Sequence, residues 1–223
     1  MSISRIIFCI LYLIVLLCYF FSETSGNLKR RAVNKILMAT MFLGYFLFES
    51  YRNGYWPQTC FFLCIIAFVF SWIGDVWLLF DFKKGGIAFM IGNVFFTAYL
   101  IALAVVNDVT FTAVWWAIPV FLLLSSVFFV CHFTKKIDFK SIGVLMPIYV
   151  TTVTSHGVLS VAIASAIGGL HMLLLALGLF LFMVSDYFLT VHKFVAHKKW
   201  VLRCNSGTYF TGMLLAAVSF TFI

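Results

Sequence analysis

The chain has 223 residues, of which 64% are hydrophobic and only 10% are charged, and its formal net charge is +8. A soluble domain carries roughly 25% charged residues, so this composition excludes a protein with a fully water-exposed surface. The positive charge does not indicate nucleic-acid binding, because the basic residues occur only in short breaks between apolar stretches, as membrane topology signals do.

Eight apolar stretches follow one another along the chain. A helix needs about 20 residues to cross the hydrocarbon core of a bilayer. We predict spans at about 6–22, 35–51, 58–80, 86–106, 110–131, 141–164, 168–191 and 204–223. These stretches are too long and too uniform for barrel strands, which alternate in roughly 10-residue segments. The expected fold is one all-α integral membrane domain over residues 1–223, with eight transmembrane helices.

The basic residues predict the orientation of these helices. Thirteen of them lie in the breaks after the first, third, fifth and seventh spans: Lys29, Arg30, Arg31, Lys35, Lys83, Lys84, Lys135, Lys136, Lys140, Lys193, Lys198, Lys199 and Arg203. The other side of the membrane has only Arg5 and Arg52. The positive-inside rule therefore places the four basic breaks in the cytoplasm and both termini outside it. The same charge pattern favours a retained first helix over a cleaved signal peptide.

Two aspartates lie inside predicted spans, Asp75 in the third and Asp186 in the seventh. A carboxylate within a span costs roughly 2.5–3.5 kcal/mol on insertion scales, so it indicates a functional residue unless a polar neighbour satisfies it. Each aspartate lies about five residues before the cytoplasmic end of its span, and at about 1.5 Å per residue both reach a similar depth. We therefore interpret them as a pair with a shared function.

The other acidic residues allow simpler interpretations. Glu23, Asp81, Asp108 and Asp138 fall in breaks or at span ends, where we expect water to solvate them. Glu49 lies near the outer end of the second span and can pair with Arg52. No spacing of His, Cys or carboxylates matches a metal motif, and no metal or cofactor is expected.

The two halves of the chain show a weak internal similarity. Gly74-Asp75 corresponds to Ser185-Asp186, and Asn93 follows Asp75 by 18 residues as Asn205 follows Asp186 by 19. This spacing suggests two parallel four-helix repeats with a site between them.

The chain resembles the YhhN-type integral membrane family, which includes the lysoplasmalogenases. The resemblance covers nearly the whole chain and lies in residues 74–79 and 178–186, each with its aspartate, and in Tyr209-Phe210. Lys35 looks like the lysine of a Lys-Pro pair in the family.

This sequence departs from the family pattern at three positions. Asn93 stands where the family often has His, Ile36 where it has Pro, and Met213 where it has Gln or His. The departures put a supporting role of those positions in question, whereas both aspartates are retained.

We expect a multi-pass protein of a bacterial inner membrane.

The resemblance implies hydrolysis of the vinyl ether bond of a lysoplasmalogen, giving a fatty aldehyde and a glycerophospho-alcohol. One of Asp75 and Asp186 would be the catalytic acid and the other the base, by a logic similar to that of glycosidases, and the sequence leaves open which is which. The substrate would be a lysophospholipid delivered by the surrounding membrane lipid. The predicted substrate-binding residues are Lys35, Asn93, Tyr99, Tyr149, Ser185, Asn205 and Tyr209.

Two alternatives belong to other functional classes. Paired intramembrane carboxylates in parallel repeats also suit a proton-coupled transporter of small molecules or lipids. A lipid-binding membrane protein without catalytic activity is the third reading.

Overall fold

The computed structural model describes residues 3–23, 27–139 except 56–58, and 142–222, and all regular elements in these ranges are helices. They are α1 (Ile3–Glu23), α2 (Leu28–Arg52), α3 (Thr59–Trp77), α4 (Phe82–Val106), α5 (Phe111–Val114), α6 (Ala117–Phe133), α7 (Leu145–Ile167), α8 (Gly169–Phe194) and α9 (Lys199–Ser219). In these ranges, six helices are long and apolar enough to cross a membrane: α1, α2, α3, α4, α7 and α8. The chain is therefore an all-helical, multi-pass membrane protein.

The fifth predicted span, 110–131, is not one continuous helix. It divides into the single turn of α5 and the 17-residue α6, with Trp115 and Trp116 between them. Pro119 lies in the first turn of α6 and has no N–H to donate to the carbonyl of Trp115, so it suits a helix start better than a helix interior.

Two helices begin earlier than the apolar pattern predicts because polar residues cap them. The Asn27 side chain accepts a hydrogen bond from the backbone N–H of Arg30, and α2 begins at Leu28 instead of 35. The Asp81 carboxylate accepts from the N–H groups of Lys83 and Lys84, and α4 begins at Phe82 instead of 86. Such caps satisfy the first N–H groups of a helix, which have no partner within it.

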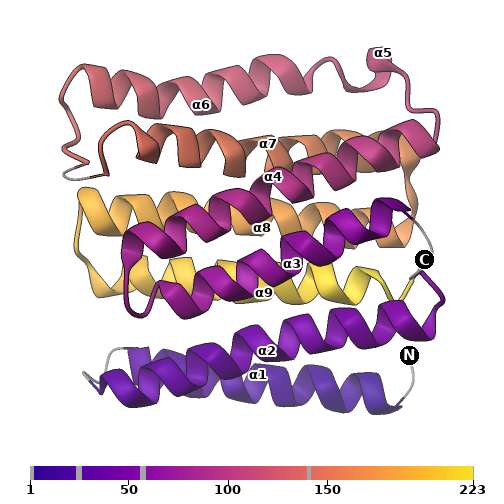
Figure 1. The fold of residues 1–223 in the computed structure, drawn as a ribbon, viewed down its shortest axis with the longest axis horizontal. Helices are drawn as coiled ribbons and strands as arrows, with labels where there is room; N and C mark the ends of the chain where they lie inside the picture. Colours follow the sequence, from indigo (N-terminus) through magenta and orange to yellow (C-terminus); the bar gives the residue numbers. More distant parts are fainter. Residues whose placement is uncertain (1–2, 24–26, 56–58, 140–141, 223) are drawn as a thin grey trace.

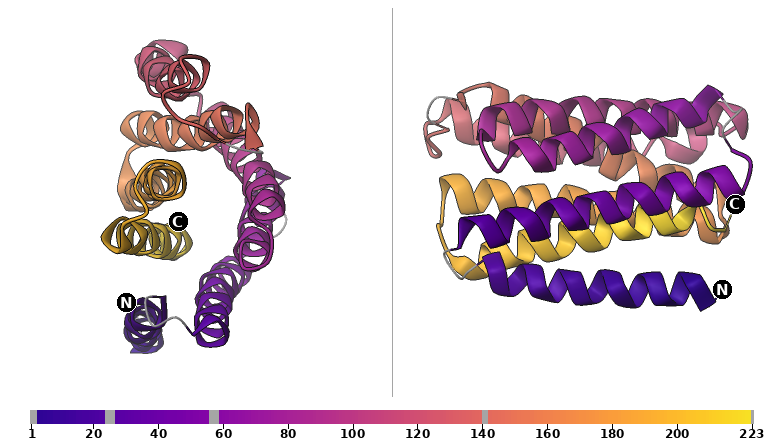
Figure 2. Two further views of the ribbon diagram at one scale, coloured as in Figure 1. Left: turned by 90° about the vertical axis from the view of Figure 1, so that its left-hand side faces the viewer. Right: turned by 60° about the horizontal axis from the view of Figure 1, so that its bottom comes forward.

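The helices form two layers that face each other (Figure 2). One layer is the curved row of α2, α3 and α4; the other contains α1, α9, α8 and α7, with α6 on the outer side of α7. The layers meet at both edges, where α1 packs on α2 and α4 packs on α7. Together α1, α2, α3, α4, α7, α8 and α9 surround the interior of the bundle.

The basic breaks gather at one end of the bundle. The helices α1, α3, α6 and α8 end there, and α2, α4, α7 and α9 begin there (Figure 1). The first turn of α1 and the last turn of α9 lie at the opposite end. The structure thus segregates the positive charge of the described basic residues along the bundle as the sequence predicts, and Lys140 lies outside the described residues.

Small residues bring α8 and α9 into close contact. A Cβ atom placed on Gly178 would lie 2.6 Å from the carbonyl oxygen of Gly212, and one on Gly212 would lie 2.6 Å from that of Gly178. Such small-residue contacts let membrane helices approach at backbone distance. The contact fixes α8, which carries Asp186, against α9, which carries Tyr209.

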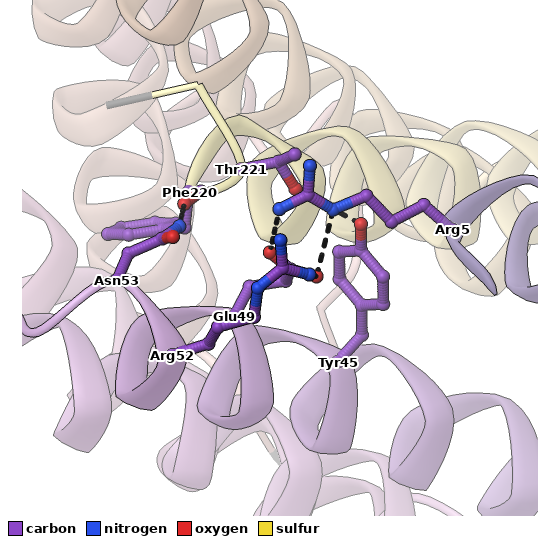
Figure 3. A network of polar contacts seen from close by, with 7 residues as sticks. All are labelled: Arg5, Tyr45, Glu49, Arg52, Asn53, Phe220 and Thr221. Atoms are coloured by element: carbon purple, nitrogen blue, oxygen red, sulfur yellow. Dashed lines mark hydrogen bonds and ion pairs between the residues drawn. The ribbon is translucent and has the colours of Figure 1, made fainter. Parts of the chain in front are cut away.

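A buried ion-pair network holds α1 and α2 together at the end opposite to the basic breaks (Figure 3). Glu49 is 1% exposed, and the Arg5 guanidinium donates to both of its carboxylate oxygens, at 3.1 and 2.6 Å. Arg52, the predicted partner, lies farther away at 3.7 Å. Beside this network, α2 bonds to the end of α9 through Tyr45 Oη and Thr221 Oγ1 (3.0 Å) and through Asn53 Nδ2 and Phe220 O (2.8 Å).

Candidate functional site

A cavity of about 740 Å³ lies between the two layers at the basic end of the bundle. It is lined by side chains from α1, α2, α3, α4, α8 and α9, so six helices contribute to one interior space. Five of the predicted site residues are among its lining residues: Lys35, Asp75, Asp186, Asn205 and Tyr209.

Asp75 is held by two partners from two other helices. It lies in the last turn of α3 and is 1% exposed. The Lys35 ammonium of α2 is 3.2 Å from its Oδ1 atom, and the Tyr209 hydroxyl of α9 donates to its Oδ2 atom at 2.6 Å. A charged group so well shielded from water is tolerated only with a paired counter-charge and hydrogen bonds, and Asp75 has both.

The Tyr209 hydroxyl has a fixed direction because its ring is enclosed by other rings. Phe89, Phe182 and Phe42 pack edge-on around it, with ring centroids 5.8, 5.2 and 6.4 Å away. The residue is 6% exposed. Tyr209 therefore presents its hydroxyl to Asp75 with little rotational freedom.

Asp186 has a different set of partners. It lies in α8 and is 4% exposed, and the Tyr149 hydroxyl of α7 donates to its Oδ2 atom at 2.6 Å. Among the described residues no cation is within ion-pair distance of Asp186, although Asp75 and Lys35 are close enough to interact with it electrostatically. The site thus contains one carboxyl group with a cation and one with a neutral donor.

Ser185 and Asn205 join α8 to α9 next to this pair. The Asn205 amide donates to the backbone carbonyl of Ser185 at 2.9 Å. The Ser185 hydroxyl donates within its own helix, to the carbonyl of Phe182, at 2.7 Å. Asn205 lines the cavity, whereas Ser185 is fully buried behind it.

Two predicted residues of α4 lie away from the cavity. Asn93 is completely buried and lies one helical turn beyond Phe89, the last residue of α4 that lines the cavity. Tyr99 is about 15 Å farther along the helix axis than Phe89, at about 1.5 Å per residue. Its ring packs near that of Phe220, at the opposite end of the bundle. The sequence places both on the correct helix but does not show how far from the aspartates they lie.

Glu23 is not solvated, contrary to the prediction. It is 7% exposed, and its Oε1 atom accepts hydrogen bonds from the Tyr19 hydroxyl at 3.0 Å and the Ser206 hydroxyl at 2.5 Å. The end of α1 packs beside α9 and so carries Glu23 into the cavity wall. The spacing of Tyr19 and Glu23 by four residues places both on one face of α1, and this was the only hint in the sequence that they could contact each other.

Basic residues also line the cavity. In the sequence, Lys29, Arg31 and Lys193 indicated only the membrane orientation. In the structure they line the cavity together with Lys35 and the imidazole of His192. The cavity therefore combines three carboxyl groups with a basic rim.

An apolar groove of about 40 Å³ adjoins the cavity between α4 and α7. Leu78, Phe82, Phe89 and Leu189 line both spaces, so the groove and the cavity share part of their walls. Tyr149, the donor to Asp186, also lines the groove. A polar space with ionisable groups next to an apolar groove fits an amphipathic molecule, with its polar part beside the aspartates.

Comparison with known proteins gives one match. The model described as the YhhN family matches residues 30–220, which include both aspartates, Lys35 and the two tyrosine donors. No curated protein and no solved structure matches the chain.

Proposed function

Because the chain belongs to the YhhN family, we propose that it is an intramembrane hydrolase that cleaves the vinyl ether bond of lysoplasmalogens. The products would be a fatty aldehyde and a glycerophospho-alcohol such as glycerophosphoethanolamine. One observation carries the proposal: Asp75 and Asp186 line the same cavity, but only Asp75 is paired with a cation. Two carboxyl groups in different surroundings are what acid–base cleavage of an ether requires.

The different partners suggest the role of each aspartate. Asp186, whose hydrogen-bond partner Tyr149 is neutral, is suited to carry a proton and act as the acid. Asp75, which faces the Lys35 ammonium, is suited to remain a carboxylate and act as the base. In this assignment the Lys35 charge serves Asp75, and other cations of the cavity are left for the substrate phosphate.

The reaction begins with protonation of the substrate. Asp186 donates its proton to the outer carbon of the vinyl ether, and the π electrons of the double bond form the new C–H bond. The resulting oxocarbenium ion lies beside the Asp75 carboxylate, whose negative charge stabilises it as in a glycosidase.

Water completes the reaction. Asp75 takes a proton from a water molecule as its oxygen attacks the cationic carbon, which gives a hemiacetal. When the hemiacetal collapses, Asp75 returns this proton to the glycerol oxygen as the C–O bond breaks, and Asp186 takes the hydroxyl proton. One water is consumed and both aspartates regain their starting states.

The shape of the site supports a lysolipid substrate. The alkenyl chain would lie in the apolar groove beside Phe89 and Tyr149, and the glycerophosphate would occupy the cavity. The vinyl ether joins these two parts of the molecule and would then lie next to the aspartates.

We also propose that all eight long helices cross the membrane, with the basic end in the cytoplasm. The charge segregation of the bundle supports this orientation. In a cysteine-free background, Asp108→Cys should react with a membrane-impermeant thiol reagent on intact cells. Lys135→Cys should react only after the membrane is permeabilised, and the opposite pattern would contradict the orientation.

The enzyme assay is aldehyde release from a lysoplasmalogen by purified protein in detergent. We expect wild type to release aldehyde, and Asp75→Asn and Asp186→Asn each to reduce the rate by roughly 10²–10⁴-fold, the usual contribution of a general acid or base. Release that survives both substitutions would refute the two-carboxylate mechanism. Absence of release by wild type, together with uptake into sealed vesicles, would support a transporter instead.

A further inference from the structure

The cavity wall holds two buried atoms that belong to side chains of opposite charge, and these side chains do not pair with each other. The Glu23 Oε2 atom and the Arg31 Nε atom are both buried, and neither has a hydrogen-bond partner within the described residues. Both residues line the cavity and interact electrostatically. No ion pair joins them within the described part of the chain, so each retains an unused hydrogen-bonding position.

Leaving such atoms unsatisfied is costly, which makes them unusual in a folded protein. A buried polar atom without a partner loses its hydration and gains no hydrogen bond in return. Glu23 is also firmly oriented, because the Tyr19 and Ser206 hydroxyls hold its other oxygen. A ligand with a cationic donor at one end and an anion at the other would satisfy both groups at once.

We propose that Glu23 and Arg31 form a headgroup subsite for phosphoethanolamine, with the phosphate on Arg31 and the ammonium on Glu23. The inference rests on the proposed function for its substrate class, a lysophospholipid. In phosphoethanolamine only two methylene carbons separate the ammonium from the phosphate ester, which suits two neighbouring groups of opposite charge in one cavity. The guanidinium is well matched to phosphate oxygens.

The chemistry of Glu23 selects ethanolamine over choline. A primary ammonium has three N–H donors for a carboxylate oxygen, whereas a trimethylammonium group has none. With choline bound, Glu23 Oε2 would remain without a hydrogen bond. Glu23 belongs to α1, which precedes residues 30–220 of the family match, so this half of the subsite is contributed from outside the matched region.

The test measures binding without catalysis. Three lysolipids with the same saturated alkyl ether chain are compared, carrying phosphoethanolamine, phosphocholine or a phosphate alone; they have no vinyl double bond to protonate. Calorimetry on the full-length protein in detergent gives each Kd. We expect wild type to bind the ethanolamine lipid about tenfold or more tightly than the other two, the difference made by one charge-assisted hydrogen bond.

Variants assign the preference to the two residues. Glu23→Gln should abolish the preference for ethanolamine, and Arg31→Gln should weaken binding of all three lipids, which share a phosphate. Asp108→Asn is the matched control, because it removes an exposed carboxylate at the opposite end of the bundle and should leave every Kd unchanged.

Equal affinities of wild type for the three lipids would overturn the subsite, and so would an ethanolamine preference that persists in Glu23→Gln. If Glu23→Gln does not fold, the wild-type comparison alone decides. A wild type that prefers ethanolamine but releases no aldehyde from a lysoplasmalogen would support the subsite and contradict the hydrolase proposal. The two proposals can therefore fail separately.

Discussion

The ammonium of Lys35 lies 3.2 Å from the Asp75 carboxylate, deep in the wall of the cavity. The side chains are 11% and 1% exposed, so the pair is largely shielded from water. Within the described residues, this contact gives Asp75 a cation that Asp186 does not have, and it distinguishes two aspartates that look equivalent in the sequence.

Removing the Lys35 charge should damage both folding and activity. In Lys35→Met, Asp75 would be a buried carboxylate with only the Tyr209 hydrogen bond, and losing one partner of a buried pair costs roughly 3–5 kcal/mol. We expect a lower unfolding midpoint in detergent and a large loss of aldehyde release. The double variant Lys35→Met/Asp75→Asn should recover most of the stability but none of the activity. A double variant as unstable as the single one would refute the pairing.

The two tyrosine hydroxyls should contribute to catalysis more than to folding. Tyr149→Phe and Tyr209→Phe keep the rings and remove the 2.6 Å hydrogen bonds to Asp186 and Asp75. A hydrogen bond to a charged group such as the Asp75 carboxylate contributes about 1.5–3 kcal/mol, and one to a neutral group such as protonated Asp186 about 0.5–1.5 kcal/mol. Tyr209→Phe should therefore lower kcat roughly 10- to 100-fold and Tyr149→Phe roughly 2- to 10-fold. Tyr187→Phe is the control: its hydroxyl bonds to Thr154 and it does not line the cavity. An equal loss in all three variants would indicate a general packing effect.

Filling the apolar groove should affect long-chain substrates selectively. Met90 lines the groove, and Met90→Trp would occupy space proposed for the alkenyl chain. Overpacking costs about 1–3 kcal/mol, which corresponds to a KM raised about tenfold or more for a long-chain lysoplasmalogen. A short-chain analogue should be affected much less. Val105→Trp, on the exposed face of the same helix, should change neither value. A similar KM increase for both chain lengths would place the chain elsewhere.

The contact between α8 and α9 should not tolerate a methyl group. In Gly178→Ala the new Cβ would lie 2.6 Å from backbone atoms of α9, so the helices would have to separate and the unfolding midpoint should fall. Gly44→Ala is the matched control, a helical glycine with no atom within 4 Å of the new Cβ. It should be neutral or stabilising by about 0.4–1 kcal/mol, since alanine restricts the unfolded chain. Equal midpoints for the two variants would contradict the close contact.

Properties that depend on local composition could be read from the sequence. Hydropathy over about 20 residues identified a multi-pass helical membrane protein, because a lipid-exposed segment must satisfy its backbone internally. The basic breaks predicted that their charges share one end of the bundle, which the structure confirms. The two aspartates were recognisable as unusual because a carboxylate in an apolar stretch is costly wherever the chain folds.

Only the tertiary structure decided which side chains meet. The direction of a residue around its helix and the identity of the neighbouring helix do not follow from hydropathy. Thus Lys35 proved to be the partner of Asp75, Glu23 was brought into the cavity by α1, and Asn93 and Tyr99 were left outside it. Apolar helices are similar in sequence, so their packing depends on small contacts such as that between Gly178 and Gly212, which become visible only when both helices are in place.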